Sequence, residues 1–276
     1  MNARFDAENL SPVSETLLIP LVARAEAGDA QAAEAVRRLK TTSGRFSRDR
    51  YRMRAVALRS RWFDQTTVQM LARHAEALVL NLGARLDDRA RRIGAQHLFG
   101  LDWIDLDLPE VLALRAVVAP DAAPIRSAPA DLRKPEAWIE VLPWRQGRPV
   151  VVLAEGVLMY LAAAEVERLI RSLAAKAHVL SCPLELAFDY ASPLMAATSW
   201  IHPSIRATGA RFDWGLRRPG DLAVWAPGLR TVDHYDIGRR LGFAPAAASA
   251  GYRLATGGRR IYACARCEVV QVPGWM

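Results

Sequence analysis

The chain has 276 residues, enough for one large α/β domain or two small ones. Hydrophobic residues make up 51% of the sequence and charged residues 24%, which excludes wholesale disorder. The net charge of +8 comes from scattered basic residues without a stripe of interleaved aromatics, so we expect no nucleic-acid partner. No apolar run approaches the ~20 residues of a membrane span, so we expect no membrane segment either.

Three helical patterns precede the first expected strand. Residues 13–28 form an amphipathic pattern in which Pro20 interrupts the helix or shifts its start. Residues 29–40 form a second helical pattern, and residues 51–76 form a third after a polar, turn-prone stretch.

Strands and helices alternate from residue 77 onward. The expected strands cover 77–83, 102–108, 123–132, 149–156 and 183–191. The fourth is a continuous apolar run, which is typical of a parallel strand buried on both faces. This alternation predicts an α/β fold with a doubly wound, mostly parallel, Rossmann-like sheet.

Residues 192–250 break this rhythm with tryptophans, prolines and glycines. We expect a lid insertion there that covers a substrate, then a strand at 229–237 and a helix at 238–243. The chain should close with a hairpin turned at Gly257 and Gly258. The expected single domain thus has four parts: a helical cover (13–76), a cofactor-binding core (77–191), the insertion and return to the sheet (192–250), and the C-terminal hairpin (251–276).

The three cysteines are interpreted as structural residues. Cys264 and Cys267 have CxxC spacing, but no second pair supplies zinc ligands, and both fall on an expected strand. A redox CxxC would instead open a helix. The odd cysteine count, with no recognisable signal peptide, indicates a reducing cytoplasm.

Acidic residues occur at the ends of four expected strands: Asp107, Asp131, Glu155 and Asp189. Ligands of open α/β sheets bind beyond these carboxyl ends. Each acid alone is also explained as a cap of the following helix. Together, around the turn that begins at Gly83, they favour a shared ligand. A nicotinamide cofactor is disfavoured because that turn lacks the GxGxxG pattern.

Several segments together resemble one family. They are NLGARLDDRARRIG (81–94), DLDLPEVLALR (105–115) and VVVLAEGVLMYL (150–161), with TLLIPLVARA (16–25) and ALRSRWFD (57–64) before them. These segments resemble the leucine carboxyl methyltransferase superfamily, and most nearly its bacterial branch of tetracenomycin-type polyketide O-methyltransferases. The resemblance implies a class I methyltransferase fold and S-adenosylmethionine (SAM) as cofactor. The implied reaction is methyl transfer to a carboxylate or hydroxyl oxygen of a small, polyketide-like or other secondary-metabolite acceptor.

The resemblance also implies roles for cofactor residues by position. They are Arg59 for the SAM carboxylate, Gly83 and Glu155 for the methionine moiety, Asp107 for the ribose hydroxyls, and Asp131 with Leu132 for the adenine. Such pairings agree with simple chemistry, because a carboxylate pairs with a guanidinium and a diol with a carboxylate. Arg59, taken alone, is equally explained as a surface residue of a helix.

Two residues depart from the family pattern. Arg85 stands where the turn usually has a second glycine, and Asp88 where threonine is usual. Arg85 either crowds the cofactor, turns outward, or itself binds the SAM carboxylate. The first outcome defines our alternative hypothesis, a family member that has lost methyl transfer and binds a ligand or catalyses another reaction in the same cleft.

The acceptor side is less defined by the sequence. A carboxylate acceptor is ionised at neutral pH and needs no base, whereas a phenol benefits from one. His202 is the candidate catalytic base, with a packing or surface role as the alternative. Tyr190, Trp200 and Trp214 are candidate walls of a flat acceptor pocket, although each is also a candidate core residue. We expect a small-molecule acceptor and a monomer or homodimer.

Overall fold

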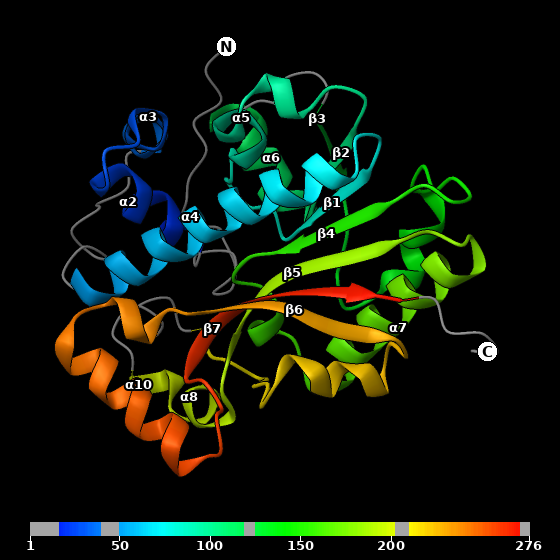
Figure 1. The fold of residues 1–276 in the computed structure, drawn as a ribbon. Helices are drawn as coiled ribbons and strands as arrows, with labels where there is room; N and C mark the ends of the chain where they lie inside the picture. Colours follow the sequence, from blue (N-terminus) through cyan, green and yellow to red (C-terminus); the bar gives the residue numbers. More distant parts are fainter. Residues whose placement is uncertain (1–16, 40–49, 119–124, 202–209, 271–276) are drawn as a thin grey trace.

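A seven-stranded sheet forms the centre of the computed structural model, which describes residues 17–39, 50–118, 125–201 and 210–270 (Figure 1). The strand order is β3-β2-β1-β4-β5-β7-β6, and every strand pair is parallel except those made by β7. The strands are β1 (Leu78–Leu82), β2 (Asp102–Asp107), β3 (Ile125–Pro129), β4 (Val150–Ala154), β5 (Leu184–Ala191), β6 (Leu229–Asp236) and β7 (Tyr262–Val269). The predicted doubly wound, mostly parallel α/β sheet is confirmed.

Helices cover both faces of this sheet (Figure 1). The α-helices are α2 (Leu18–Glu26), α3 (Ala30–Arg38), α4 (Arg50–Arg73), α5 (Arg89–Ile93), α6 (Pro109–Val118), α7 (Ala163–Val179), α8 (Pro193–Ala197) and α10 (Phe243–Ala255). Short 3-10 helices lie at Ala95–His97, Pro135–Ala137, Ile139–Val141, Leu158–Tyr160, Ser199–Ile201, Pro219–Val224 and Gly238–Arg240. Pro20 lies in the first turn of α2, where proline is tolerated, so it does not interrupt this helix.

Two hydrophobic cores form because side chains alternate along buried strands. Leu78 and Leu80 of β1 pack on the face covered by α7, while Val79 packs on the face covered by α4 and α5. Every residue of β1 and β4 is buried, as the continuous apolar run at 150–154 predicted. A third cluster joins α2 and α3 to Leu86, just after β1, and to α6. The N-terminal helices therefore pack beside the turn that follows β1.

The predicted C-terminal hairpin is wrong. Residues 243–255 form α10, an alanine-rich helix whose last turn contains the Tyr252 that we placed on a strand. The predicted helix at 238–243 is reduced to the 3-10 turn Gly238–Arg240. β7 lies antiparallel between β5 and β6. The C-terminal strand therefore pairs with these two strands of the sheet and not with the other arm of a hairpin.

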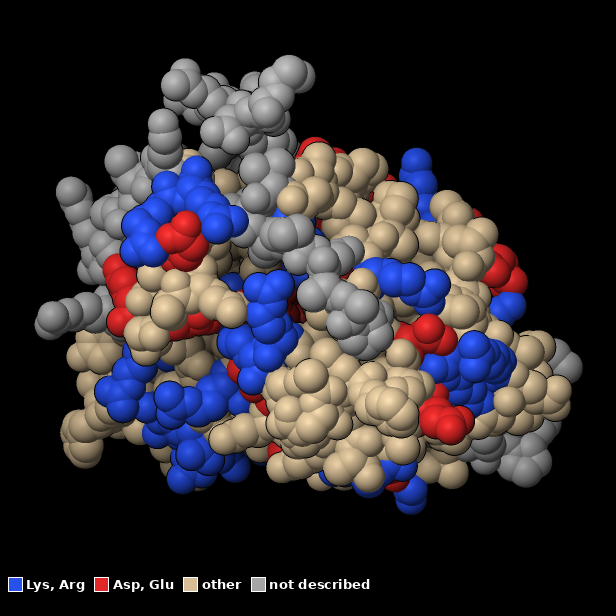
Figure 2. All heavy atoms as spheres, turned by 90° about the horizontal axis from the view of Figure 1, so that it is seen from above, with Lys and Arg blue, Asp and Glu red and all other residues tan. Residues whose placement is uncertain are grey.

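Cys264 and Cys267 are buried strand residues on β7, as predicted. Within the described ranges, no cluster of His, Cys, Asp or Glu could hold a metal ion. The helices in those ranges are also too short or too polar to cross a bilayer. On the face shown in Figure 2, basic side chains form separate groups interrupted by acidic and other residues.

Candidate active site

The turn after β1 is held in a left-handed backbone conformation. Gly83 has a φ of +59°, and a Cβ on it would lie 2.5 Å from Cγ2 of Val157, so this position requires glycine. Arg85 also has a positive φ, +52°, which is uncommon for a residue with a side chain. Its backbone N–H donates to Oδ2 of Asp107 at 2.6 Å. The turn is thereby tied to the end of β2.

Arg115 on α6 ties the same turn down from the other side. Its guanidinium donates to the carbonyls of Arg85, at 3.1 Å, and Asp87, at 2.6 Å. It also pairs with Asp105 of β2 at 2.6 Å. Asp105 accepts two further hydrogen bonds and is nearly inaccessible, and burial raises its pKa. Asp105 is therefore a structural acid that positions the turn.

Glu155, immediately after β4, is enclosed by cationic partners. Its Oε1 accepts from Nε of Arg59 at 2.9 Å and from the hydroxyl of Ser60 at 2.8 Å, and its Oε2 accepts from Arg89. Burial alone would raise the pKa of Glu155, but the guanidinium groups of Arg89 and Arg59 outweigh it and hold the pKa below its ordinary value. Glu155 is therefore ionised at neutral pH.

Arg59 on α4 is buried and shared among three partners. Besides Glu155, its Nη1 donates to Asp189 on β5 at 3.1 Å and to the hydroxyl of Tyr262 at 2.8 Å. Tyr262 in turn donates to Asp189 at 2.6 Å, and burial raises its pKa well above the ordinary range, so the phenol stays neutral. Sequence reasoning missed Tyr262, because nothing in the strand RIYACARC shows that β7 brings it beside Arg59.

A cavity of about 680 Å³ lies at the carboxyl edge of the sheet. Its walls include Gly83, Asp107, Asp131 and Leu132, so the structure brings these predicted residues together. The Asp107 carboxylate is mostly buried, which raises its pKa, and it accepts hydrogen bonds from the backbone N–H groups of Arg85 and Leu108. Because the resemblance implies that Asp107 contacts the ribose and that Asp131 and Leu132 border the adenine, we call this space the adenosine cavity.

Asp131 is engaged by its own neighbour. Both of its carboxylate oxygens accept from the Arg133 side chain at 2.8 Å, and these hydrogen bonds lower its pKa. Its side chain is also more exposed than that of Asp107. Of the two predicted acids that line this cavity, Asp107 is therefore the better placed to bind a ligand in a protected position.

A second cavity, of only about 30 Å³, lies between the turn and the end of β4. Arg59, Gly83, Arg85 and Glu155 all border it, so these predicted residues also come together. The Arg85 guanidinium, on its wall, extends to the end of β4 and donates to the carbonyl of Gly156. We call this space the methionine subsite.

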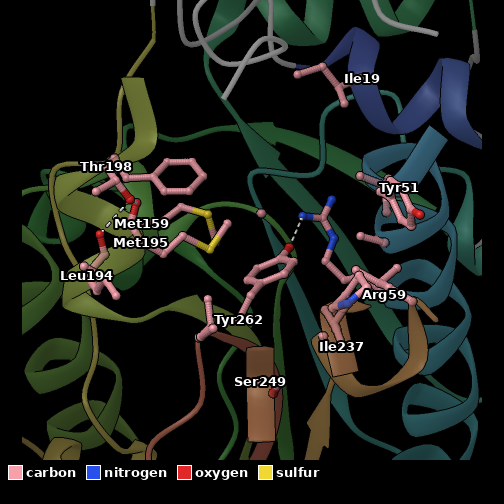
Figure 3. A pocket seen from close by; sticks show the side chains of 18 of the residues that line it. Ile19, Tyr51, Arg59, Met159, Leu194, Met195, Thr198, Ile237, Ser249 and Tyr262 are labelled. Atoms are coloured by element: carbon pink, nitrogen blue, oxygen red, sulfur yellow. Dashed lines mark hydrogen bonds between the residues drawn. The ribbon is translucent and has the colours of Figure 1, made fainter. Parts of the chain in front are cut away.

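The third cavity, of about 410 Å³, is mostly apolar (Figure 3). Figure 3 shows Leu194 and Met195 of α8, with Thr198 just after this helix, on one side and Tyr51 and Arg59 of α4 on the other. Tyr262 lies between them, with its hydroxyl toward Arg59. Because its apolar walls suit the small-molecule acceptor that the resemblance implies, we call this space the acceptor cavity. It adjoins the adenosine cavity, because Arg85 and Tyr160 line both.

The predicted aromatic walls do not line any of these three cavities. Tyr190 lies in the core, where burial raises its pKa to about 12. Trp214 packs against Trp225 in the same core, with 6.2 Å between ring centroids. Trp200 is 65% exposed. The sequence identifies these residues only as aromatic. Whether an aromatic residue faces a cavity depends on the direction of its side chain, which the residue type does not give.

Tyr160 and Phe212 are the aromatic pair that does border the acceptor cavity. Their ring centroids lie 5.2 Å apart in an edge-to-face arrangement. Tyr160 is contained in the AEGVLMYL segment, whereas Phe212 had no distinguishing signal in the sequence. His202, the predicted base, lies outside the described residues.

Comparisons with known proteins agree with this architecture. The family model of leucine carboxyl methyltransferases matches residues 7–174, more than half of the chain. The chain is 33% identical over 237 residues to the tetracenomycin polyketide synthesis O-methyltransferase TcmP of Streptomyces glaucescens, covering 83% of this chain and 84% of that protein. It is 30% identical over 243 residues to the S-adenosyl-L-methionine-dependent methyltransferase dpfgK of Gibberella zeae, covering 80% and 81%.

A solved structure supports the fold at lower sequence similarity. The crystal structure of a putative methyltransferase from Thermobifida fusca has a TM-score of 0.55 and 15% identity, and covers 93% of this chain and 94% of that one. The sequence matches carry the assignment further than the fold alone. The chain belongs to the leucine carboxyl methyltransferase family.

Proposed function

We propose that this chain is a SAM-dependent O-methyltransferase whose acceptor is a small, flat, largely apolar molecule with a carboxylate or hydroxyl oxygen. One observation carries the proposal. A cavity with a buried carboxylate, Asp107, adjoins an apolar cavity at the carboxyl edge of the sheet, with Arg85 and Tyr160 between them. The two curated relatives, both methyltransferases by name, support the same reaction.

The adenosine half of SAM fits the residues present. Asp107 offers a carboxylate to a ribose diol, and Leu132 offers an apolar edge to the adenine. The methionine half fits less well, since about 30 Å³ remains in its subsite while Arg85 contacts Gly156. Arg59 and Glu155 border that subsite and are the residues proposed to hold the methionine moiety once Arg85 has moved.

The bound cofactor supplies a methyl group on a positively charged sulfur. The chain positions the two reactants and excludes water. Apolar side chains such as Met159 and Phe212 exclude water from the acceptor cavity and hold the acceptor near the cofactor. No Asp, Glu or His occurs among the described residues that line this cavity, and Tyr262 stays neutral. This favours an acceptor oxygen that is already ionised, such as a carboxylate with a pKa of ~4. His202 remains the proposed base for a hydroxyl acceptor.

Titration calorimetry with S-adenosylhomocysteine tests the cofactor assignment. We expect binding at micromolar strength, followed in a second assay by transfer of labelled methyl from SAM to aromatic acids in preference to phenols. A folded protein without detectable binding of S-adenosylhomocysteine would contradict the proposal.

A second function is favoured by the contact between Arg85 and Gly156. If that contact never opens, the chain is a family member that has lost methyl transfer and uses the acceptor cavity to bind another ligand. Arg85→Gly should then create SAM binding that the unaltered protein lacks. Equal affinity of the two proteins for SAM would count against this alternative.

A further inference from the structure

Arg85 differs from the other buried or half-buried arginines around the turn, because its guanidinium has no carboxylate partner among the described residues. The others are ion-paired: Arg24 with Asp88, Arg59 with Glu155 and Asp189, Arg89 with Asp64 and Glu155, Arg92 with Asp64 and Asp87, and Arg115 with Asp105. Among the described residues, the Arg85 guanidinium makes no ion pair within 4 Å. It donates to the Gly156 carbonyl and lies 5.7 Å from the ring centroid of Tyr160. Arg85 is thus a cation whose charge no neighbouring acid neutralises at contact distance.

The backbone of Arg85 is fixed while its side chain is free to change partner. Asp107 holds its N–H and Arg115 holds its carbonyl, so the Cα cannot move far. The guanidinium is held by a neutral carbonyl and a weak aromatic contact. An anionic acceptor adds a Coulomb attraction to the guanidinium that a neutral carbonyl lacks, and a site of low dielectric constant strengthens it. An anion within reach would therefore draw the guanidinium away from Gly156.

The acceptor cavity is the place where such an anion fits. Arg85 lines this cavity as well as the methionine subsite and the adenosine cavity. Arg59 is the other cation on its described walls, and two carboxylates already share Arg59. The remaining walls are mostly apolar, which strengthens an ion pair formed inside.

We propose that Arg85 selects acceptors that carry an anionic oxygen and couples their binding to that of the cofactor. This inference rests on the proposed methyltransferase function. Without an acceptor, the guanidinium occupies the space between the turn and Gly156. A flat apolar acid in the acceptor cavity pairs with the guanidinium, and the same movement opens the methionine subsite. Because such coupling is reciprocal, each ligand tightens the binding of the other.

Calorimetric titration of S-adenosylhomocysteine, with and without naphthoate, tests the coupling. Naphthamide, a neutral molecule of nearly the same shape, is the ligand control. In the unaltered protein, we expect naphthoate to tighten S-adenosylhomocysteine binding by about tenfold, in the usual range for linked sites, and naphthamide to have little effect. Arg85→Gly should bind S-adenosylhomocysteine more tightly than the unaltered protein without any acid, and naphthoate should no longer matter. Arg91→Ala, an exposed arginine on α5, should behave like the unaltered protein.

The outcomes separate this inference from the proposed function. Binding of S-adenosylhomocysteine that naphthoate leaves unchanged, or changes equally in Arg85→Gly, overturns the coupling and leaves the methyltransferase proposal standing. Binding by Arg85→Gly alone, even with naphthoate present, also overturns the coupling and supports loss of methyl transfer. Absence of binding in every folded protein contradicts the methyltransferase proposal itself.

Discussion

The cofactor side and the acceptor side of this site are built in opposite ways. On the cofactor side, the residues follow β1, β2 and β4, and ion pairs and backbone hydrogen bonds fix them. On the acceptor side, α2, α4, α8 and α10 contribute mostly apolar side chains. The α10 helix buries a single residue, Ser249, which donates to Asp236. The edge of the sheet thus provides a rigid site for the cofactor. The helices packed on it provide the wall of the acceptor cavity, whose residues can vary.

The largest effect is expected on the cofactor side, from Glu155→Gln. This change removes the charge that compensates two buried guanidinium groups, those of Arg59 and Arg89. Breaking a buried pair in this way costs about 3–5 kcal/mol. Chemical denaturation should show this loss. The exposed pair of Glu167 and Arg171 on α7 is the control, and Glu167→Gln should cost below about 0.5 kcal/mol. Equal losses of stability in Glu155→Gln and Glu167→Gln would show that Glu155 and its two arginine partners do not form a rigid support.

The carboxylate of Glu155 also predicts that the stability of the fold decreases at acidic pH. The pKa of Glu155 is lower in the folded chain than its ordinary value of about 4.3, so its ionised form favours the folded state. This contribution is complete above that ordinary value and is lost as the pH falls through the lower, folded value. The free energy of unfolding can be measured between pH 6 and pH 3, in steps of about one pH unit. As the pH falls, it should fall less steeply for Glu155→Gln than for the unaltered protein. Parallel profiles would contradict the assignment.

Asp107→Ala should weaken S-adenosylhomocysteine binding by about 10–100-fold, because hydrogen bonds to a charged group contribute about 1.5–3 kcal/mol. Asp131→Ala is the matched control in the same cavity, and its effect should be smaller because Arg133 already occupies that carboxylate. Calorimetry on both folded variants makes the comparison. A larger loss in Asp131→Ala would reverse the roles we give to these two acids.

Ser249→Ala should affect the acceptor side alone. It removes the hydroxyl that donates to the buried carboxylate of Asp236, at a cost of about 1–3 kcal/mol to the anchoring of α10. Amide hydrogen exchange should then become faster in residues 243–255 and stay unchanged in β1 and β2. Faster exchange throughout the sheet would show that the two sides are not separable.

The smallest effect is expected from Trp200→Ala. This side chain is 65% exposed and lines none of the three cavities, so stability should change by less than about 0.5 kcal/mol. Trp214→Ala, which empties a buried site beside Trp225, should cost about 3–5 kcal/mol. Thermal unfolding of both variants checks the contrast. A large loss in Trp200→Ala would mean that it has contacts beyond those seen here.

The same contrast explains what the sequence could predict. Residues such as Gly83, Asp107 and Leu132 could be placed because each follows a strand, and parallel strands end at one edge. Tyr262 could not, because its position depends on an antiparallel insertion of β7 between distant segments. Tyr190 and Trp214 are aromatic in the right region, yet they face the core. Which side of β5, and of the segment around Trp214, meets the core follows from tertiary packing, which local patterns do not encode.

Arg85 was recognisable in the sequence as a departure, but its consequence was not. The sequence leaves three alternatives for Arg85: it crowds the cofactor, turns outward, or binds the SAM carboxylate. Its contacts exclude the outward direction, since the side chain reaches across the site to Gly156.

The central claim is that Asp107 and the turn before it hold SAM at the carboxyl edge of the sheet. A crystal structure with S-adenosylhomocysteine bound tests this most directly. We predict the adenosine in the cavity lined by Asp107 and Leu132, the ribose hydroxyls on Asp107, and the Arg85 guanidinium displaced from the Gly156 carbonyl. A ligand bound elsewhere, or in this cavity without contact to Asp107, would contradict the account.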